Sequence, residues 1–263
     1  MPVPTTPQNA AWSVGAHSDL TTTPYPVGVL LLHGFTGSPA SIRPWGEFLG
    51  TKGYAVEVPL LPGHGTRWED LNETTWRDWY AVAEASLDKL LTENRRVVVG
   101  GLSMGAALAL MLAGNRGKDV SGVISVNVSV ENKDPRRFVL PLLKRITPSF
   151  PGIVDDIKKP GQTELGYARM PLHAAHSMLD FYRTLQPLLP QVTQPLLMLC
   201  STEDHVADAG SHRKVLESVS SIEVTEKMLP NSYHVATLDN DAPTIFEESA
   251  SFVHAVTHAQ HPE

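Results

Sequence analysis

The run GLSMG at residues 101–105 restricts the fold of this chain more than any other feature, because it joins two apolar segments of different periodicity. Residues 96–100 are typical of a buried strand and residues 106–112 of a helix. A serine on so sharp a strand-to-helix turn has a strained backbone and an exposed hydroxyl, with the helix N-terminus beneath it. Gly101 and Gly105 are expected where the chain passes too close to itself for a Cβ atom. The alternative, a chance match that serves only as a helix N-cap, is disfavoured by the strand and helix on either side.

Strands and helices alternate along most of the chain, as judged by hydrophobic periodicity. Continuous apolar runs are typical of buried parallel strands, and apolar residues three and four apart are typical of amphipathic helices. A single helix between successive strands indicates right-handed crossovers, and hence an α/β fold with a doubly wound, mostly parallel sheet. The predicted strands are 27–33, 54–61, 96–101, 122–128, 195–200 and 222–229, and the predicted helices are 38–52, 76–91, 211–219 and 244–257 besides the one after residue 105.

The alternation stops between residues 130 and 190, where eight prolines divide the chain into short pieces. We predict that residues 130–190 form a mainly helical cap, inserted into a core made of residues 25–129 and 191–263. Residues 1–24 carry little periodicity and several prolines, so they are predicted to form an N-terminal arm with at most one short edge strand.

Charge and cysteine content exclude several classes of function. The formal net charge is −7 at pH 7, and the chain has no long run of Lys or Arg. A nucleic-acid partner needs a basic face that neutralises phosphates, so we expect none and favour a neutral or lipid-like substrate. Cys200 is the only cysteine, which excludes an intramolecular disulfide and a cysteine zinc site. The pairs His173/His176 and His254/His258 lack a third ligand at a recognisable spacing, so no metal is expected.

Two features bear on membranes. The start of the chain has neither the basic nor the apolar region of a secretory signal, and no apolar run is long enough to span a bilayer, so we expect a soluble cytoplasmic protein. Within the predicted cap, however, the apolar residues 138–143 are followed by Lys144 and Arg145, which suits a flap that dips towards a lipid surface. Packing of these residues on the body of the protein is the alternative.

Ser103 needs a base to act as a nucleophile, because a serine hydroxyl is poorly reactive at neutral pH. The base is normally a histidine held by a carboxylate, and behind a turn of this kind the chain order is serine, acid, histidine. Acidic residues follow the predicted strand 195–200, at the sheet edge where ligands bind. Asp204 is preferred there. Glu203 and Asp208 are the alternatives, although Asp208 is expected to begin the following helix.

His234 is the preferred base, because it follows the predicted strand 222–229 and so lies beyond the same sheet edge as Asp204. His205 and His212 are the alternatives. His205 directly follows the acid and His212 falls within a predicted helix, so both are less suited to this task. A nucleophile, an acid and a base are therefore predicted at one edge of the sheet.

Two backbone N–H groups are expected to stabilise the negatively charged oxygen of an acyl-transfer intermediate. Met104, directly after the serine, supplies one, and Phe35, in the loop after the strand 27–33, supplies the other. His33 precedes the serine in the chain, and we interpret it as a brace for this loop rather than as a base. His64, which lies between two glycines, is interpreted in the same way.

Five motifs are distributed along most of the chain from residue 28 onward: LLHGFTG (31–37), GHGT (63–66), GLSMG (101–105), EDHV (203–206) and NSYHVATLD (231–239). Together they resemble the α/β-hydrolase family, and within it the bacterial monoacylglycerol lipases and related small carboxylesterases. The resemblance implies an α/β-hydrolase fold, with Ser103 as nucleophile, Asp204 as acid, His234 as base, and Phe35 and Met104 as oxyanion donors.

The cap segments 153–160 and 164–167 also resemble that subgroup. The resemblance implies that Glu164 helps to recognise the glycerol moiety and that Ile153 lines the narrow opening of the cap. Ala106 departs from the family pattern, which usually has a glycine after the elbow, and we expect this small-for-small change to be tolerated.

The expected function is that of a serine esterase that cleaves monoacylglycerols to glycerol and fatty acid, with no metal or organic cofactor. One alternative is a general short- to medium-chain carboxylesterase without a preference for glycerol esters. Another, from a different class, is a ligand receptor that keeps the hydrolase scaffold but turns over little. The complete set of nucleophile, acid, base and oxyanion donors favours an enzyme over a receptor.

Overall fold

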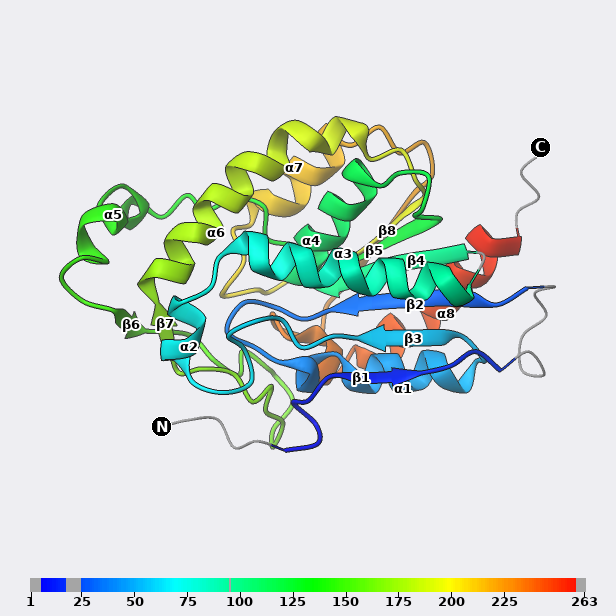
Figure 1. Ribbon diagram of the computed structural model, residues 1–263, viewed down its shortest axis with the longest axis horizontal. Helices are drawn as coiled ribbons and strands as arrows, with labels where there is room; N and C mark the ends of the chain where they lie inside the picture. The colour runs from blue at the N-terminus through cyan, green and yellow to red at the C-terminus, as the bar shows by residue number, and fades with distance from the viewer. Residues whose placement is uncertain (1–5, 18–24, 95, 259–263) are drawn as a thin grey trace.

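The computed structural model describes residues 6–17, 25–94 and 96–258, and its centre is a seven-stranded sheet (Figure 1). The strand order is β1-β3-β2-β4-β5-β8-β9, in which β1 pairs antiparallel to β3 and every other neighbouring pair is parallel. The predicted doubly wound, mostly parallel sheet is therefore confirmed. Its strands are β1 (Trp12–Val14), β2 (Val27–Leu32), β3 (Ala55–Val58), β4 (Arg96–Leu102), β5 (Gly122–Val126), β8 (Leu196–Ser201) and β9 (Val224–Leu229).

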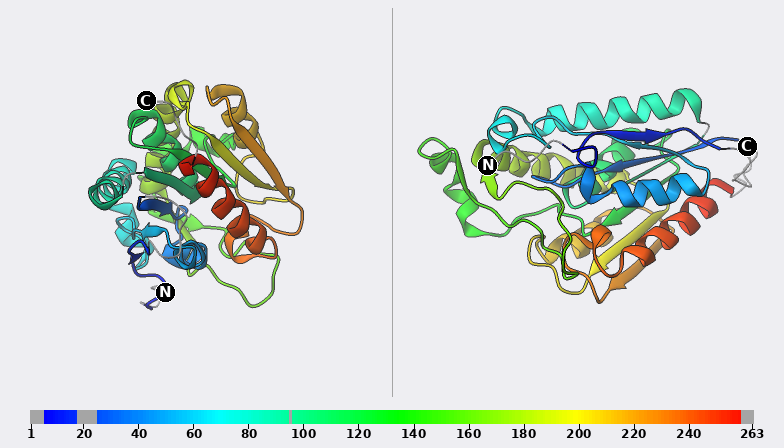
Figure 2. Two further views of the ribbon diagram at one scale, coloured as in Figure 1. Left: turned by 90° about the vertical axis from the view of Figure 1, so that its right-hand side faces the viewer. Right: turned by 90° about the horizontal axis from the view of Figure 1, so that it is seen from below.

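Helices cover both faces of the sheet, as Figure 2 shows. On one face lie α1 (Arg43–Thr51) and α8 (Ala242–His258), which contact each other over a core of aliphatic side chains from the strands. On the other face lie α3 (Trp76–Glu93), α4 (Met104–Asn115) and α7 (Gly210–Ser218). Loops from successive strands therefore meet at the carboxyl edge of the sheet, where ligands bind in folds of this kind.

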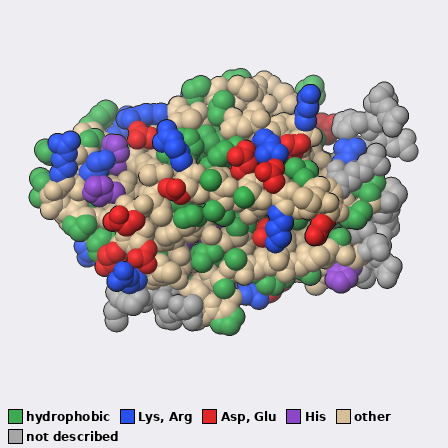
Figure 3. Space-filling view, in the orientation of Figure 1, with side chains coloured by type: hydrophobic (Ala, Val, Ile, Leu, Met, Phe, Trp, Pro, Cys, Tyr) green, Lys and Arg blue, Asp and Glu red, His purple; other side chains and the backbone are tan. Residues whose placement is uncertain are grey.

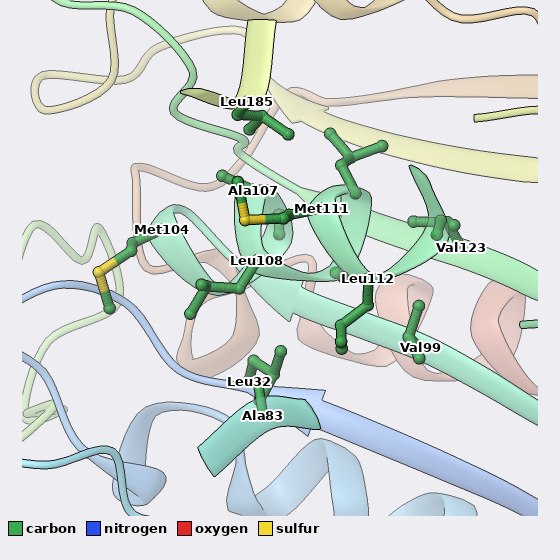
Figure 4. Packing of buried hydrophobic residues seen from close by; sticks show 14 of the residues in the cluster. Leu32, Ala83, Val99, Met104, Ala107, Leu108, Met111, Leu112, Val123 and Leu185 are labelled. Atoms are coloured by element: carbon green, nitrogen blue, oxygen red, sulfur yellow. The ribbon is translucent and has the colours of Figure 1, made fainter. Parts of the chain in front are cut away.

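Helix α4 is buried on all sides, which explains why its sequence has no polar face. Residues 104–113 are all buried, between the sheet and the elements α6 (Leu172–Leu185) and η4 (Gln186–Gln191). Figure 4 shows Leu108 and Met111 of this helix packed between neighbouring elements. A helix that is apolar all round requires such a position. The element behind the serine turn is thus held in place by the core.

Three local features differ from the predicted elements or refine them. The predicted helix 38–52 starts as the 3-10 helix η2 (Pro39–Ser41) before α1 begins. The short helix α2 (Trp68–Asn72) is not predicted, because five residues are too few to show a helical period. The strand β1 is the short edge strand expected in the N-terminal arm, of which residues 1–5 and 18–24 lie outside the described part of the chain.

The predicted cap, residues 130–190, contains two parts with different packing. Its second part, α6 and η4, packs against α3 and α4 and belongs to the body of the molecule. Its first part lies beyond the carboxyl ends of β2 and β3, at the left of Figure 1. There the structure adds a two-stranded antiparallel sheet that the sequence does not predict, because each strand has three residues and contains proline. The elements of the first part are η3 (Pro135–Phe138), α5 (Leu140–Leu143), β6 (Ser149–Pro151) and β7 (Arg169–Pro171).

Candidate active site

Ser103 lies on the turn between β4 and α4, in a backbone conformation that residues with side chains rarely adopt. Its φ is 58° and its ψ is −116°, and its N–H donates to the carbonyl of Val126 at 2.9 Å. A Cβ atom on Gly105 would lie 1.9 Å from the carbonyl oxygen of Leu32, and one on Gly101 would lie 2.4 Å from the carbonyl carbon of Gly105. The close approach expected at both glycines is therefore present, and the packed strand and helix hold the strain at Ser103.

Ser103 is only 6% exposed, whereas the sequence predicts an exposed hydroxyl. Segments of the predicted cap lie against the loop beside the serine. The N–H of Tyr167 donates to the carbonyl of Thr36 at 2.9 Å, and the hydroxyl of Ser38 donates to the carbonyl of Glu164 at 3.3 Å. Residues 164–167 of the predicted cap are therefore hydrogen-bonded to the loop beside the serine turn.

Asp204 follows β8, and its carboxylate contacts the imidazole of His234, with Oδ2 2.8 Å from Nδ1. Its Oδ1 accepts the backbone N–H groups of Val206 and Ala207 at 2.8 and 2.9 Å. Burial alone would raise the pKa of Asp204, but the hydrogen bond and charge of His234, together with the two backbone donors, outweigh it and lower that pKa. Asp204 is therefore ionised at neutral pH.

The alternative acids are engaged elsewhere. Glu203 is exposed and faces the imidazole of His205 and the ammonium of Lys158. Asp208 accepts the N–H of Gly210 at 2.9 Å at the start of α7, as expected of a residue that begins a helix, and it faces Lys133. Neither carboxylate is bonded to His234.

His234 is buried, and its contact with Asp204 assigns the two ring nitrogens different tasks. Because Nδ1 donates to the carboxylate, Nε2 carries the free lone pair that can accept a proton. The alternative bases have other partners: Nδ1 of His205 contacts Asp156 at 2.8 Å, and Nδ1 of His212 contacts the thiol of Cys200 at 2.8 Å. Of the three candidates, only His234 meets the acid.

The loop after β2 approaches the serine closely, since a Cβ atom on Gly34 would lie 3.5 Å from the Cβ of Ser103. His33 holds this loop: its Nδ1 donates to the carbonyl of Gly34 at 2.9 Å, and its Nε2 accepts the N–H of Leu61 at 3.2 Å. Burial lowers the pKa of His33 to about 4, so the ring is neutral and acts as a brace, as interpreted from the sequence. Met104 is the first residue of α4, and its N–H has no partner within the helix.

Phe35 and His64 belong to one aromatic cluster under the same loop. The ring of Phe35 packs on Trp79 at 5.7 Å between centroids, and the ring of His64 packs on Trp79 at the same distance. His64 donates through Nδ1 to the carbonyl of Pro62 at 3.0 Å, and burial holds its pKa well below the usual value. These rings fix the position of the Phe35 backbone relative to the serine turn.

Glu164 is a buried carboxylate in the cap. Its Oε1 accepts the N–H of Asp155 at 3.3 Å, while its own N–H donates to Asp155 Oδ1 at 2.7 Å. A Cβ atom on Gly37 would lie 3.2 Å from Oε2, so the carboxylate reaches the loop that follows β2. Burial raises the pKa of Glu164 to about 6, against the opposing effect of the nearby His234. The group is therefore ionised at neutral pH and lies near the base.

Ile153 lies on the outside of the cap, just after β6, and is exposed. Phe150 and Met170, from the paired strands β6 and β7, are exposed beside it. Exposed apolar side chains in this part of the cap suit contact with an apolar group. The role of Ile153 in lining that opening stays a prediction.

Sequence reasoning missed two residues that contact the backbone of His234. Asn127, which directly follows β5 at φ 44°, donates its amide to the carbonyl of His234 at 2.7 Å. Asp156, in the cap, accepts the N–H of His234 at 3.1 Å. These contacts join positions 107 and 78 residues apart, so no local pattern in the chain announces them.

A cavity of about 210 Å³ lies behind the acid, lined by Asp204, Cys200 and His212 among others. Burial raises the pKa of Cys200 to about 12, so its thiol is protonated and unsuited to act as a nucleophile. Ser103 does not line this cavity. Of Cys200 and Ser103, only Ser103 is therefore suited to act as the nucleophile.

Neither a metal cluster nor a bilayer-spanning helix occurs in the described ranges. No three side chains of His, Cys, Asp or Glu among residues 6–17, 25–94 and 96–258 are grouped so that they could hold a metal ion. Over the same ranges, every helix is too short or too polar to cross a membrane.

Comparison with known proteins shows which family the chain resembles. The model of the alpha/beta hydrolase family matches residues 29–248. A thermostable monoacylglycerol lipase of Bacillus sp. (strain H-257) is 36% identical over 234 residues, which cover 86% of this chain and 90% of that lipase. A carboxylesterase of Bacillus subtilis (strain 168) is 25% identical over 231 residues, which cover 86% of this chain and 91% of that esterase.

Solved structures extend the likeness to three dimensions. A chain from a study of LipS and LipT, two metagenome-derived lipolytic enzymes, is 34% identical with a TM-score of 0.89, and the match covers 96% of this chain and 100% of that one. The monoacylglycerol lipase of Paleococcus ferrophilus is 16% identical with a TM-score of 0.76, over 94% of this chain and 98% of that lipase. At the lower identity the likeness concerns the fold alone.

Proposed function

The chain belongs to the alpha/beta hydrolase family, and from this premise we propose that it is a serine hydrolase that cleaves monoacylglycerols to glycerol and a fatty acid. The observation that carries the proposal is the 2.8 Å contact between Asp204 and His234 at the sheet edge where the strained Ser103 lies. The 36% identity to a monoacylglycerol lipase supports the substrate class.

In the proposed reaction, Ser103 Oγ attacks the ester carbonyl carbon while His234 Nε2 takes the hydroxyl proton. Asp204 keeps the imidazole in the required tautomer and stabilises the imidazolium that forms. The oxyanion of the tetrahedral intermediate accepts hydrogen bonds from the backbone N–H groups of Phe35 and Met104. Collapse of the intermediate breaks the ester C–O bond, and His234 returns its proton to the leaving glycerol oxygen. Water then attacks the acyl-enzyme by the same route and releases the fatty acid.

Glu164 is the proposed source of the preference for glycerol esters. Its carboxylate is buried and ionised at neutral pH, so it can accept hydrogen bonds from the free hydroxyls of a monoacylglycerol. An ester without these hydroxyls would give the carboxylate no partner beyond the N–H of Asp155, and sites built in this way discriminate strongly against the analogue that lacks the hydroxyl. A general carboxylesterase would not need a buried carboxylate at this place.

A substrate panel tests this proposal. The wild-type protein should hydrolyse a monoacylglycerol with a kcat/KM at least about tenfold above that for the matching triacylglycerol, because a triacylglycerol offers Glu164 no hydroxyl. In Glu164→Gln the kcat/KM for the monoacylglycerol should fall about tenfold or more, while that for p-nitrophenyl butyrate stays within about threefold. Equal losses on both substrates, or no preference in the wild type, would favour the general carboxylesterase instead.

We also propose that the cap contacts a lipid surface transiently. Phe138 and Ile146 are each 74% exposed, and Leu142 lies exposed between them in the chain. The basic residues Arg136 and Arg137 precede this patch in sequence, and Lys144 and Arg145 lie directly before Ile146. In Figure 3, hydrophobic and basic side chains gather at the end of the molecule where α5 lies. An apolar patch bordered by cations suits an anionic lipid surface.

A further inference from the structure

The backbone of His234 is held on both sides by side chains from distant elements. Asp156 Oδ2 accepts its N–H at 3.1 Å, and Asn127 Nδ2 donates to its carbonyl at 2.7 Å. His234 lies outside the helices and strands, so no sheet ladder or helix supplies these partners. Because its N–H and its carbonyl are both engaged, the backbone of His234 cannot shift without breaking a buried hydrogen bond.

Asp156 reaches the loop that bears the acid as well. Its Oδ1 contacts Nδ1 of His205 at 2.8 Å, and its Oδ2 accepts the N–H of His205 at 3.3 Å. Its carbonyl accepts the N–H of Val235 at 3.0 Å. One cap residue therefore bonds to the neighbour of Asp204 and to the backbone of His234. Its side chain is only 9% exposed, so water cannot readily replace these bonds.

The residues that follow Asp156 are fixed to the same loop by a second carboxylate. Asp239 accepts the N–H groups of Lys158 and Lys159 at 2.6 and 2.9 Å, and it also accepts the N–H of Tyr233 at 2.9 Å. The cap segment 156–159 and the loop that carries His234 thus form one hydrogen-bonded unit. A displacement of this cap segment would remove the acceptor from the His234 N–H.

We propose that Asp156 is a positioning residue for the hydrolase reaction: together with Asn127 it clamps the backbone of His234 and so couples closure of the cap to alignment of the acid and base. This inference rests on the proposed serine hydrolase chemistry. Asp156 acts through His234, and its loss displaces the base rather than removing a reacting group.

The test separates alignment of the base from integrity of the fold. A p-nitrophenyl alkylphosphonate reacts once with the serine of such an enzyme, so the final amount of p-nitrophenol counts competent sites and the rate constant reports how well the base is aligned. Asp156→Ala should label to the same end point as the wild type with a rate constant about tenfold to a hundredfold lower, the cost of a small misplacement. Its kcat for a monoacylglycerol should fall in parallel, with KM within about threefold.

Two further variants sharpen the test. Asp156→Asn keeps an oxygen that can accept the His234 N–H, so it should restore the labelling rate to within about threefold of the wild type. Glu203→Gln is the matched control, because this exposed carboxylate belongs to the same charged cluster but does not contact His234, and it should label at the wild-type rate. If Asp156→Ala does not fold, Asp156→Ser serves in its place, since its shorter side chain cannot bond both loops.

Two results for Asp156→Ala would overturn the inference. The first is an unchanged labelling rate constant with a reduced end point, which denotes a purely structural role. The second is a wild-type rate constant together with a wild-type end point. A wild-type protein that does not react with the phosphonate contradicts the proposed function itself, and the inference with it.

Discussion

Glu164 is a buried carboxylate whose proposed role in substrate recognition has a consequence for stability. Its pKa is raised by burial from 4.5 to about 6, so between these values the folded protein holds a proton that the unfolded chain has already lost. The contribution of Glu164 to stability is therefore greatest below pH 4.5 and decreases as pH rises towards 6, by about 2 kcal/mol in total. The protein keeps this unfavourable charge at neutral pH, in agreement with the proposed binding of substrate hydroxyls by Glu164.

Glu164→Gln should remove this pH dependence, because the amide does not ionise. The free energy of unfolding of the variant minus that of the wild type should rise by about 2 kcal/mol between about pH 4 and about pH 8. Urea unfolding of both proteins at the two pH values measures the difference, and other titrating groups cancel in it. The same difference at both pH values would contradict the assignment of a raised pKa.

At the residue scale, sequence reasoning predicts those site residues that local context identifies. Ser103 is set by the strand and helix on either side of it, and Asp204 and His234 follow from their places after two strands of one sheet. Asn127 and Asp156 carry no such signal, because they act through backbone contacts to a residue far along the chain. The residues next to them in the sequence form no recognisable motif, and only the folded structure shows their contacts with His234.

At the scale of elements, long periodic segments are predictable and short ones are not. The helix α3 begins with a capping box, in which Asp78 accepts the N–H of Thr75 at 2.8 Å, and its apolar pattern then extends over five turns. The paired strands β6 and β7 have three residues each, which is too short for any alternation to register. The assignment of residues 130–190 as one cap insertion stays a prediction, since α6 packs with the body of the molecule.

The cap patch around α5 yields a prediction for lipid binding. The double variant Phe138→Ser/Ile146→Ser should bind anionic phosphatidylglycerol vesicles at least about tenfold more weakly than the wild type, because each side chain contributes about 1.5 to 3 kcal/mol when fully buried in an apolar phase. Vesicle co-sedimentation measures this. Turnover of a water-soluble ester should be unchanged, because neither side chain belongs to the proposed catalytic machinery.

The control for this experiment is Ile222→Ser. Ile222 is 97% exposed and precedes β9, at the edge of the sheet opposite to the cap. Its replacement removes a similar apolar area without touching the patch, so vesicle binding should remain at the wild-type level. Equal binding by the wild type and the double variant would exclude the cap patch as the lipid contact.

At the scale of the whole molecule, the parallel sheet brings together residues that lie in separate motifs along the chain. It delivers the loops after β2, β4, β8 and β9 to one edge, where the proposed oxyanion loop, nucleophile, acid and base meet. The alternation of strands and helices predicts this edge, and therefore most of the proposed machinery. How the cap lies on that edge depends on irregular segments held by individual side-chain bonds, and for this reason it is not predictable from periodicity.

The central claim is that ester cleavage proceeds through an acyl-enzyme on Ser103, and the most direct measurement is fatty-acid release from a monoacylglycerol by the wild type and by Ser103→Ala. The wild type should turn over, and the variant should be slower by at least about a thousandfold with an unchanged melting temperature, because removal of the nucleophile leaves the fold intact. Turnover by Ser103→Ala within about tenfold of the wild type would contradict the account.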